Sequence, residues 1–232
     1  MTVWQTVVGA LVTLAIALAV AGLSIRGHAR YCRAFTAYLV FVLVTDLLVM
    51  SWPDRFWTWP FWFFQQTMAD VLKIAVALEL AYWIFLGFPG AARSARGVLL
   101  LLLVATLLAV VALPNEASRD TRGYLIGSLR PRLQIGALWV FTALAGLVRW
   151  YRVPLHPMHR TIILGFVAYL TIFGTFLHLV ADYGWSRHVE TAEPIAYLAA
   201  CSWWAWEGWR REPALDADAA VVARLQPWRV PC

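Results

Sequence analysis

The sequence predicts an all-α polytopic membrane protein with seven transmembrane helices, an outside N-terminus and a cytoplasmic C-terminus. Of its 232 residues, 62% are hydrophobic and 14% are charged, whereas soluble domains have about 45–50% apolar and about 25% charged residues. The mean hydropathy is +0.67, and the apolar residues gather in long runs separated by short arginine clusters. A chain of this length cannot hide so much apolar surface from water, so part of its solvent must be lipid.

Seven apolar runs are long enough, or nearly long enough, to cross a bilayer as helices. A span needs about 20 residues, with about 17 as the lower limit, and a helix satisfies its own backbone hydrogen bonds in lipid. The runs are 3–23, 34–50, 62–86, 98–113, 132–148, 161–181 and 195–209. The fourth is free of charge, and the seventh carries Glu207, which is spaced to pair with Arg210. We expect one bundle over 1–209 and a short tail over 210–232.

The distribution of arginine predicts the orientation of these spans. The first, third and fifth connections contain arginines and no acidic residue, whereas Asp54 balances Arg55 in the second. The last connection carries Glu190 and Glu193 against Arg187. Because positively charged loops stay on the cytoplasmic side, the odd-numbered connections are expected inside the cell. We therefore predict a multi-pass protein of the cytoplasmic (inner) membrane.

The third run, 62–86, contains ionisable residues that are unusual in a membrane span. Lys73 is the only lysine of the chain, and Asp70 and Glu79 lie beside it in the same run. Each such group costs at least ~2.5–3.5 kcal/mol in the bilayer. Helical spacing puts Gln66, Asp70 and Lys73 on one face and lets Asp70 pair with Lys73. Glu79 falls on the opposite face, about 13 Å further along the helix.

Other polar residues are predicted at the depth of the Asp70–Lys73 pair. Asp46 falls in the outer third of the second helix, and His178 falls near the outer end of the sixth. Two interpretations stay open: an outward-facing ligand pocket or proton relay, in which a histidine titrates near neutral pH, and a charge network that fixes helix packing. The candidate ligand-binding or proton-relay residues are Asp46, Gln66, Asp70, Lys73 and His178, with Glu79 and Asp182 as secondary candidates.

Tryptophans cluster around the second connection. Trp52, Trp57, Trp59 and Trp62 fall within eleven residues of one another in WPDRFWTWPFW. A belt that anchors the helices at the outer headgroup level is the expected role. An aromatic box for a cationic or cyclic ligand is the alternative.

The sequence has no motif for a cofactor, a metal ion or a soluble-enzyme reaction. It lacks the phosphate-binding loop, the dinucleotide fingerprint and the HExxH and GxSxG motifs. Retinal needs a lysine in the seventh helix, but the lone lysine lies in the third run. A bis-histidine haem needs two histidines at matching depth, and only His178 is predicted inside the membrane. His156 and His159 have metal-like spacing but no cysteine or acidic neighbour. We expect no cofactor and no metal.

Two stretches carry a resemblance to a known group. Phe35–Val44 (FTAYLVFVLV) opens the second run, and Ala77–Phe85 (ALELAYWIF) closes the third. Together with the hydropathy layout of the whole chain, they resemble small uncharacterised bacterial seven-helix integral membrane proteins. The resemblance implies the membrane-embedded helical fold and supplies no activity, so no functional residue is carried over.

These features favour a non-enzymatic membrane protein that is a small-ligand sensor or receptor, or an accessory subunit of a larger membrane complex. The alternative is a proton- or ion-coupled transporter that uses the Asp/Lys/His cluster, although neither broken helix pairs nor inverted repeats are evident. The expected partners are the lipid bilayer, other membrane subunits or further copies of this chain, and a small periplasmic ligand. Nucleic acid is excluded, because the arginines stand in short loop clusters and form no basic face.

Overall fold

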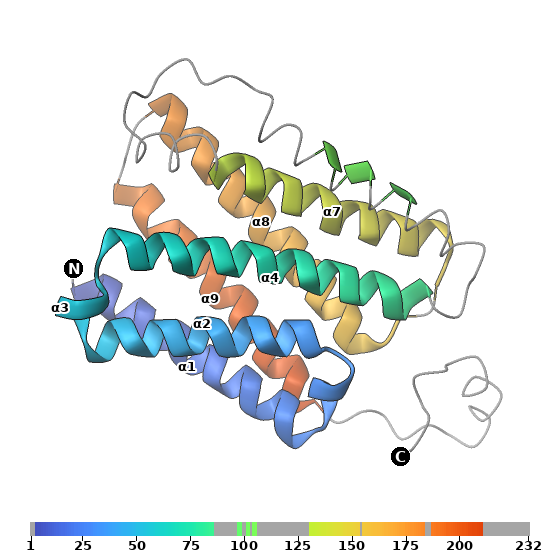
Figure 1. The fold of residues 1–232 in the computed structure, drawn as a ribbon, viewed down its shortest axis with the longest axis horizontal. Helices are drawn as coiled ribbons and strands as arrows, with labels where there is room; N and C mark the ends of the chain where they lie inside the picture. The colour runs from blue at the N-terminus through green and yellow to red at the C-terminus, as the bar shows by residue number, and fades with distance from the viewer. Residues whose placement is uncertain are drawn as a thin grey trace.

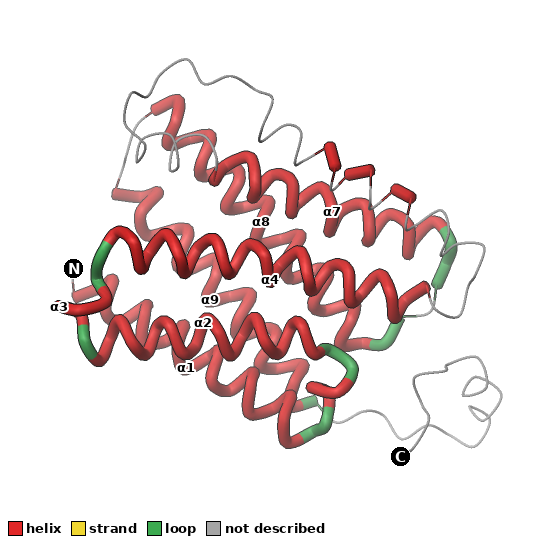
Figure 2. The backbone as a smooth tube through the Cα atoms, in the orientation of Figure 1, coloured by secondary structure: helices red, strands yellow, loops and turns green. Residues whose placement is uncertain are grey.

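The chain forms a bundle of helices that run up and down beside one another (Figure 1). The computed structural model describes residues 3–85, 97–98, 101–102, 104–105, 130–153, 155–183 and 187–210, and every regular element within them is helical. The long helices are α1 (Val3–Ile25), α2 (Arg33–Ser51), α4 (Trp59–Phe85), α7 (Arg130–Trp150), α8 (Pro157–Tyr183) and α9 (Arg187–Trp209). The short η1 (His28–Arg30) and α3 (Pro53–Phe56) connect α1 to α2 and α2 to α4 (Figure 2). The predicted all-α class is confirmed for this part of the chain.

Four of the helices are long and apolar enough to cross a membrane, over Thr6–Ile25, Arg33–Ser51, Arg132–Trp150 and Pro157–Phe176. They correspond to the first, second, fifth and sixth predicted spans, and they indicate a membrane protein. Helix α4 is also long enough to cross a membrane but is not one of these four, and it contains Asp70, Lys73 and Glu79. The side chains of α9 are described only from Pro194 onward. Most of the fourth predicted span, and the tail from 211 to 232, lie outside the described residues.

Proline and glycine mark the ends of several helices. Pro53 and Pro157 are the first residues of α3 and α8, and Pro60 and Pro131 are the second residues of α4 and α7. The first N–H groups of a helix have no intrahelical acceptor, so proline loses no hydrogen bond there. Gly27 follows α1 with φ 75°, a left-handed conformation that suits glycine at a helix end. These residues define where the chain turns between spans.

The six long helices that the structure describes form a closed ring in chain order. Each packs against the next, and α9 returns to pack along α1 (Figure 1). The α1–α9 contact is close, because a Cβ atom added at Gly22 would lie 3.0 Å from the backbone carbon of Gly208. The Nε1–H of Trp209 donates to the carbonyl of Leu18 at 2.9 Å. Small residues commonly permit such approach between membrane helices, and here they bring α1 and α9 together.

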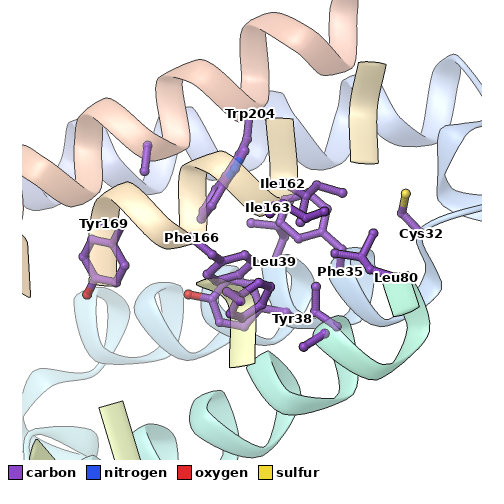
Figure 3. Close-up of a cluster of buried hydrophobic side chains, with 14 of the residues drawn as sticks. Cys32, Phe35, Tyr38, Leu39, Leu80, Ile162, Ile163, Phe166, Tyr169 and Trp204 are labelled. Carbon is purple, nitrogen blue, oxygen red and sulfur yellow. The ribbon is translucent and has the colours of Figure 1, made fainter. Parts of the chain in front are cut away.

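An aromatic cluster fills the centre of the ring (Figure 3). Phe166 of α8 stacks on Phe141 of α7, with ring centroids 4.6 Å apart, and also contacts Trp204 of α9 at 4.9 Å. Tyr38 of α2 meets Phe166 at 5.5 Å, and Phe35 of the same helix meets Trp204 at 5.3 Å. All five side chains are buried. Aromatic pairs add about 0.5–1.5 kcal/mol each beyond their area burial, so this cluster ties four of the helices together.

The two ends of the bundle differ in charge. The η1 segment, the α7–α8 connection and the end of α9 all carry arginines, and they lie together at one end, which we call the arginine end (Figure 1). Helix α3 and the N-terminus lie at the opposite end, which we call the α3 end.

The carboxylate of Glu207 pairs with the guanidinium of Arg210 at 3.6 Å, which confirms the pairing predicted from their spacing.

Candidate functional site

A cavity of about 550 Å³ lies between the helices at the α3 end. Its lining comes from α1, α2, α3, α4, α8 and α9, and therefore from both ends of the chain. The aromatic lining residues are Tyr38, Phe56, Trp57, Trp59, Phe61, Trp62, Tyr169 and Tyr197. The other polar lining residues are Thr13, Asp46, Thr58, Gln65, Gln66 and Lys73. This size falls within the range of about 300–1,000 Å³ that is usual for small-molecule sites.

Asp70, Lys73 and Gln134 form a buried network between α4 and α7. The Nζ of Lys73 donates to Oδ1 of Asp70 at 2.8 Å and to Oε1 of Gln134 at 3.4 Å. The Nε2 of Gln134 donates to the same Asp70 oxygen at 2.7 Å. The predicted Asp70–Lys73 pair is therefore confirmed. Gln134 was not predicted, although an isolated amide in an apolar run is a signal that could have found it.

Asp46 lines the cavity from α2, and an amide holds its carboxylate. The Nε2 of Gln65 donates to Oδ1 of Asp46 at 3.1 Å and to Oγ1 of Thr45 at 3.0 Å. Within the described ranges, no lysine, arginine or histidine nitrogen lies within 4.0 Å of the Asp46 carboxylate. Asp46 and Lys73 thus border one cavity without pairing, and Gln66, another predicted candidate, borders it too.

Three tyrosines of the cavity were not among the predicted residues. The hydroxyl groups of Tyr38 and Tyr197 lie 3.1 Å apart, within hydrogen-bond distance. The ring of Tyr169 packs on that of Tyr197, with centroids 5.0 Å apart. The sequence contained a signal only for Tyr169, which lies in the middle of the apolar run 161–181, whereas tyrosine in membrane proteins is enriched at the interfaces. Tyr38 and Tyr197 lie near the starts of their runs, where tyrosine is common.

Two predicted residues, His178 and Asp182, lie in the last part of α8. The structure describes the helix there but not these two side chains. This part of α8 lies toward the α3 end of the bundle (Figure 1). Participation of His178 and Asp182 in the site stays a prediction.

Glu79 lies away from the cavity and caps α2. The backbone N–H groups of Arg33 and Ala34 donate to its two carboxylate oxygens at 2.9 and 2.6 Å. These are the first two N–H groups of α2, which have no acceptor within their own helix, and a negative charge is favourable at a helix N-terminus. Cys32, the N-cap residue, makes no side-chain cap. The contacts of Glu79 are therefore those of a helix cap supplied by α4.

Cys32 is buried beside this cap. Burial raises the pKa of the Cys32 thiol well above its ordinary value, and the nearby charge of Glu79 acts in the same direction. A thiol kept protonated in this way is a poor nucleophile and a poor metal ligand, so Cys32 is a packing residue in the folded protein.

Replacing Glu79 by alanine is expected to lower the free energy of unfolding by about 1–2 kcal/mol, because two N–H donors lose their acceptor. Glu79→Gln is expected to fall between the wild type and Glu79→Ala, since it keeps one acceptor oxygen. Denaturant unfolding in a mild detergent measures both. Leu78→Ala, at the exposed neighbouring position of α4, is the control. Equal stability of the wild type and Glu79→Ala would refute the cap.

One cavity is lined by a carboxylate that accepts a hydrogen bond from an amide, by the lysine of a buried ion pair and by several aromatic rings. Comparison of the chain with protein-family models, with curated proteins and with solved structures found no match. The functional argument therefore depends on the chemistry of the cavity.

Proposed function

We propose that this protein is a non-enzymatic membrane protein that binds a small ligand in the cavity at the α3 end and acts as a sensor or receptor. The observation that carries the proposal is a cavity of about 550 Å³ in which a few polar side chains converge within an aromatic wall. Ligand sites in helix bundles lie between helices and combine these two features. The aromatic rings offer contact area, and the polar groups orient the ligand.

The origin of the lining residues supports a sensing role. Thr13 of α1, Asp46 of α2, Gln66 of α4 and Tyr197 of α9 border the same space. A ligand that contacts these helices together favours the bundle conformation in which they surround it, and so shifts the population of conformations. The change would reach the arginine end, because the same helices extend to it.

We orient the protein with the arginine end in the cytoplasm. This assignment follows the positive-inside rule, under which arginine-containing connections stay inside. The cavity then faces the outer side of the membrane, and the proposed ligand is a small molecule of the periplasm.

Replacing Ala69 by phenylalanine tests the proposal. Ala69 is buried and lines the cavity, so the larger ring is expected to fill part of the space and abolish ligand binding. The measurement is the thermal stability of the purified protein in detergent with small cationic, anionic and neutral compounds. A ligand at 100 times its Kd should stabilise the wild type by about 2.7 kcal/mol, and Ala69→Phe by almost nothing.

Val71→Phe is the matched control, because Val71 lies on the same helix, is exposed and does not line the cavity. It should respond to ligands as the wild type does. If no compound stabilises the wild type, or if Ala69→Phe responds equally, the proposal fails. Proton or solute flux in liposomes that contain the wild-type protein would support the transporter alternative instead.

A further inference from the structure

We infer that the cavity takes an organic cation, a quaternary ammonium or a protonated amine, with Asp46 as its counter-ion. The inference rests on the proposed function, because it names the ligand class of the same cavity. Two observations support it: the charge balance of the cavity lining and the aromatic side chains that line the cavity together with Asp46.

Among the described residues that line the cavity, one negative charge, that of Asp46, has no positive charge paired with it. Asp46 is the acidic side chain of this lining and Lys73 the basic one. The ammonium of Lys73 is matched by Asp70 at 2.8 Å, whereas the carboxylate of Asp46 receives a neutral amide, Gln65, at 3.1 Å. A carboxylate in a low-dielectric site is costly without a partner charge, and a bound cation would supply that charge. An anion would meet the carboxylate of Asp46 and a lysine that is already paired.

Aromatic rings line the same cavity as this carboxylate. Trp57, Trp59 and Trp62 line the cavity at the α3 end, and Tyr38 and Tyr197 line it from α2 and α9. The electron-rich faces of tryptophan and tyrosine attract cations, and cages of such rings recognise quaternary ammonium groups. Trp52 and Trp57 are both largely exposed, at 59% and 62%, but only Trp57 borders the cavity. An interfacial belt does not require this difference, so we assign the tryptophans that line the cavity to the ligand site as well.

Three compounds that share one shape test the charge of the ligand. They are choline, its neutral isostere in which carbon replaces the quaternary nitrogen, and glycine betaine, in which a carboxylate replaces the CH2OH group of choline. Each is titrated into the full-length protein in detergent, and the shift in thermal midpoint gives the apparent Kd. Choline is expected to bind at least about tenfold more tightly than the isostere, because the isostere lacks both the charge and the cation–π contacts.

Replacing Asp46 by asparagine tests the counter-ion. Asp46→Asn is expected to weaken choline binding by about tenfold or more and to leave the neutral isostere unaffected, because a charge-assisted contact becomes a neutral one. The thermal midpoint without ligand should not fall, since the variant removes a charge from the membrane region. Asp54→Asn, an exposed carboxylate of α3 outside the cavity lining, is the matched control and should bind choline as the wild type does.

A second variant keeps the test decisive if Asp46→Asn does not fold. Trp57→Leu removes an aromatic face at a largely exposed position, so folding should be unaffected, and choline should bind more weakly while the isostere does not. Equal affinity of choline and its isostere, or unchanged choline binding in Asp46→Asn, would overturn the cation assignment. Tighter binding of betaine than of choline would also overturn it, in favour of a zwitterion that uses Asp46 and Lys73 together.

The outcomes for the cation and for the cavity can be told apart. If anionic or neutral compounds bind and Ala69→Phe abolishes their binding, the cation assignment fails and the proposed function stands. If no compound of any charge binds, both fail. If choline binds and both Asp46→Asn and Ala69→Phe abolish its binding, both are supported.

Discussion

Replacing Lys73 by methionine is expected to lower the free energy of unfolding by about 3–5 kcal/mol, because it leaves Asp70 as a buried carboxylate without a cation. In the folded protein the Lys73 ammonium lies 2.8 Å from Asp70 and 3.4 Å from Gln134, and both Lys73 and Asp70 are buried. Methionine keeps the length of the side chain and removes its charge and donors. Equilibrium unfolding by denaturant in a mild detergent gives the change.

The double variant Lys73→Met/Asp70→Leu distinguishes a lost charge pair from lost packing. It removes both charges together, and apolar replacements of a buried ion pair are often as stable as the pair itself. We therefore expect it to recover most of the stability that Lys73→Met loses. If Lys73→Met is as stable as the wild type, the network does not hold α4 to α7. If the double variant folds and still binds ligand, the network serves packing, whereas loss of binding assigns it to the site.

Replacing Gly165 by alanine is expected to cost about 1–3 kcal/mol or more by overpacking the core. An added Cβ atom would lie 2.9 Å from Cε2 of Trp204 and nearer still to its Nε1. Trp204 cannot easily withdraw, because it is fully buried and packs against Phe35 and Phe166. The thermal midpoint in detergent measures the loss. Gly165→Leu should be worse, since its side chain needs the space that the indole occupies.

Gly174→Ala is the matched control for this prediction. It lies on the same helix, and an added Cβ atom there would meet nothing within 4 Å. Alanine is a better helix former than glycine by about 1 kcal/mol, so this variant should be neutral or slightly stabilising.

The double variant Gly165→Ala/Trp204→Phe should recover part of the stability that Gly165→Ala loses, because the smaller phenylalanine ring leaves room for the added methyl group. Equal stability of Gly165→Ala and Gly174→Ala would disprove the close contact.

Some contacts of the candidate site follow from rules that act within one helix. Asp70 and Lys73 are three residues apart, which places them on one helical face wherever α4 lies. The same rule puts Glu79 on the opposite face, and the structure agrees, since Glu79 contacts α2 while Asp70 contacts Gln134 of α7. The helical face of Glu79 did not predict that it caps α2. That role also requires the first residues of α2 to lie beside the last part of α4, which the spacing within α4 does not determine.

Contacts between residues of different helices could not be predicted from the sequence and are known only from the structure. Gln65 and Gln66 are adjacent in the sequence, but Gln65 is the one that reaches Asp46. The distinction depends on how α4 is rotated against α2. Gln134 joins the Lys73 network across 61 residues of sequence, and Tyr38 meets Tyr197 across 159. No local spacing rule connects such residues.

The sequence by itself determined the helical class, four helices that are long and apolar enough to cross a membrane, and the Asp70–Lys73 pair. It could do so because lipid leaves the backbone few alternatives to the helix and because helical periodicity is local. Only the tertiary structure decided that Asp46 is held by an amide, that Glu79 caps α2 and that tryptophans and tyrosines of distant helices border one cavity. These features depend on the order, rotation and depth of helices in the ring, and those follow from the packing of small and aromatic side chains over the whole bundle.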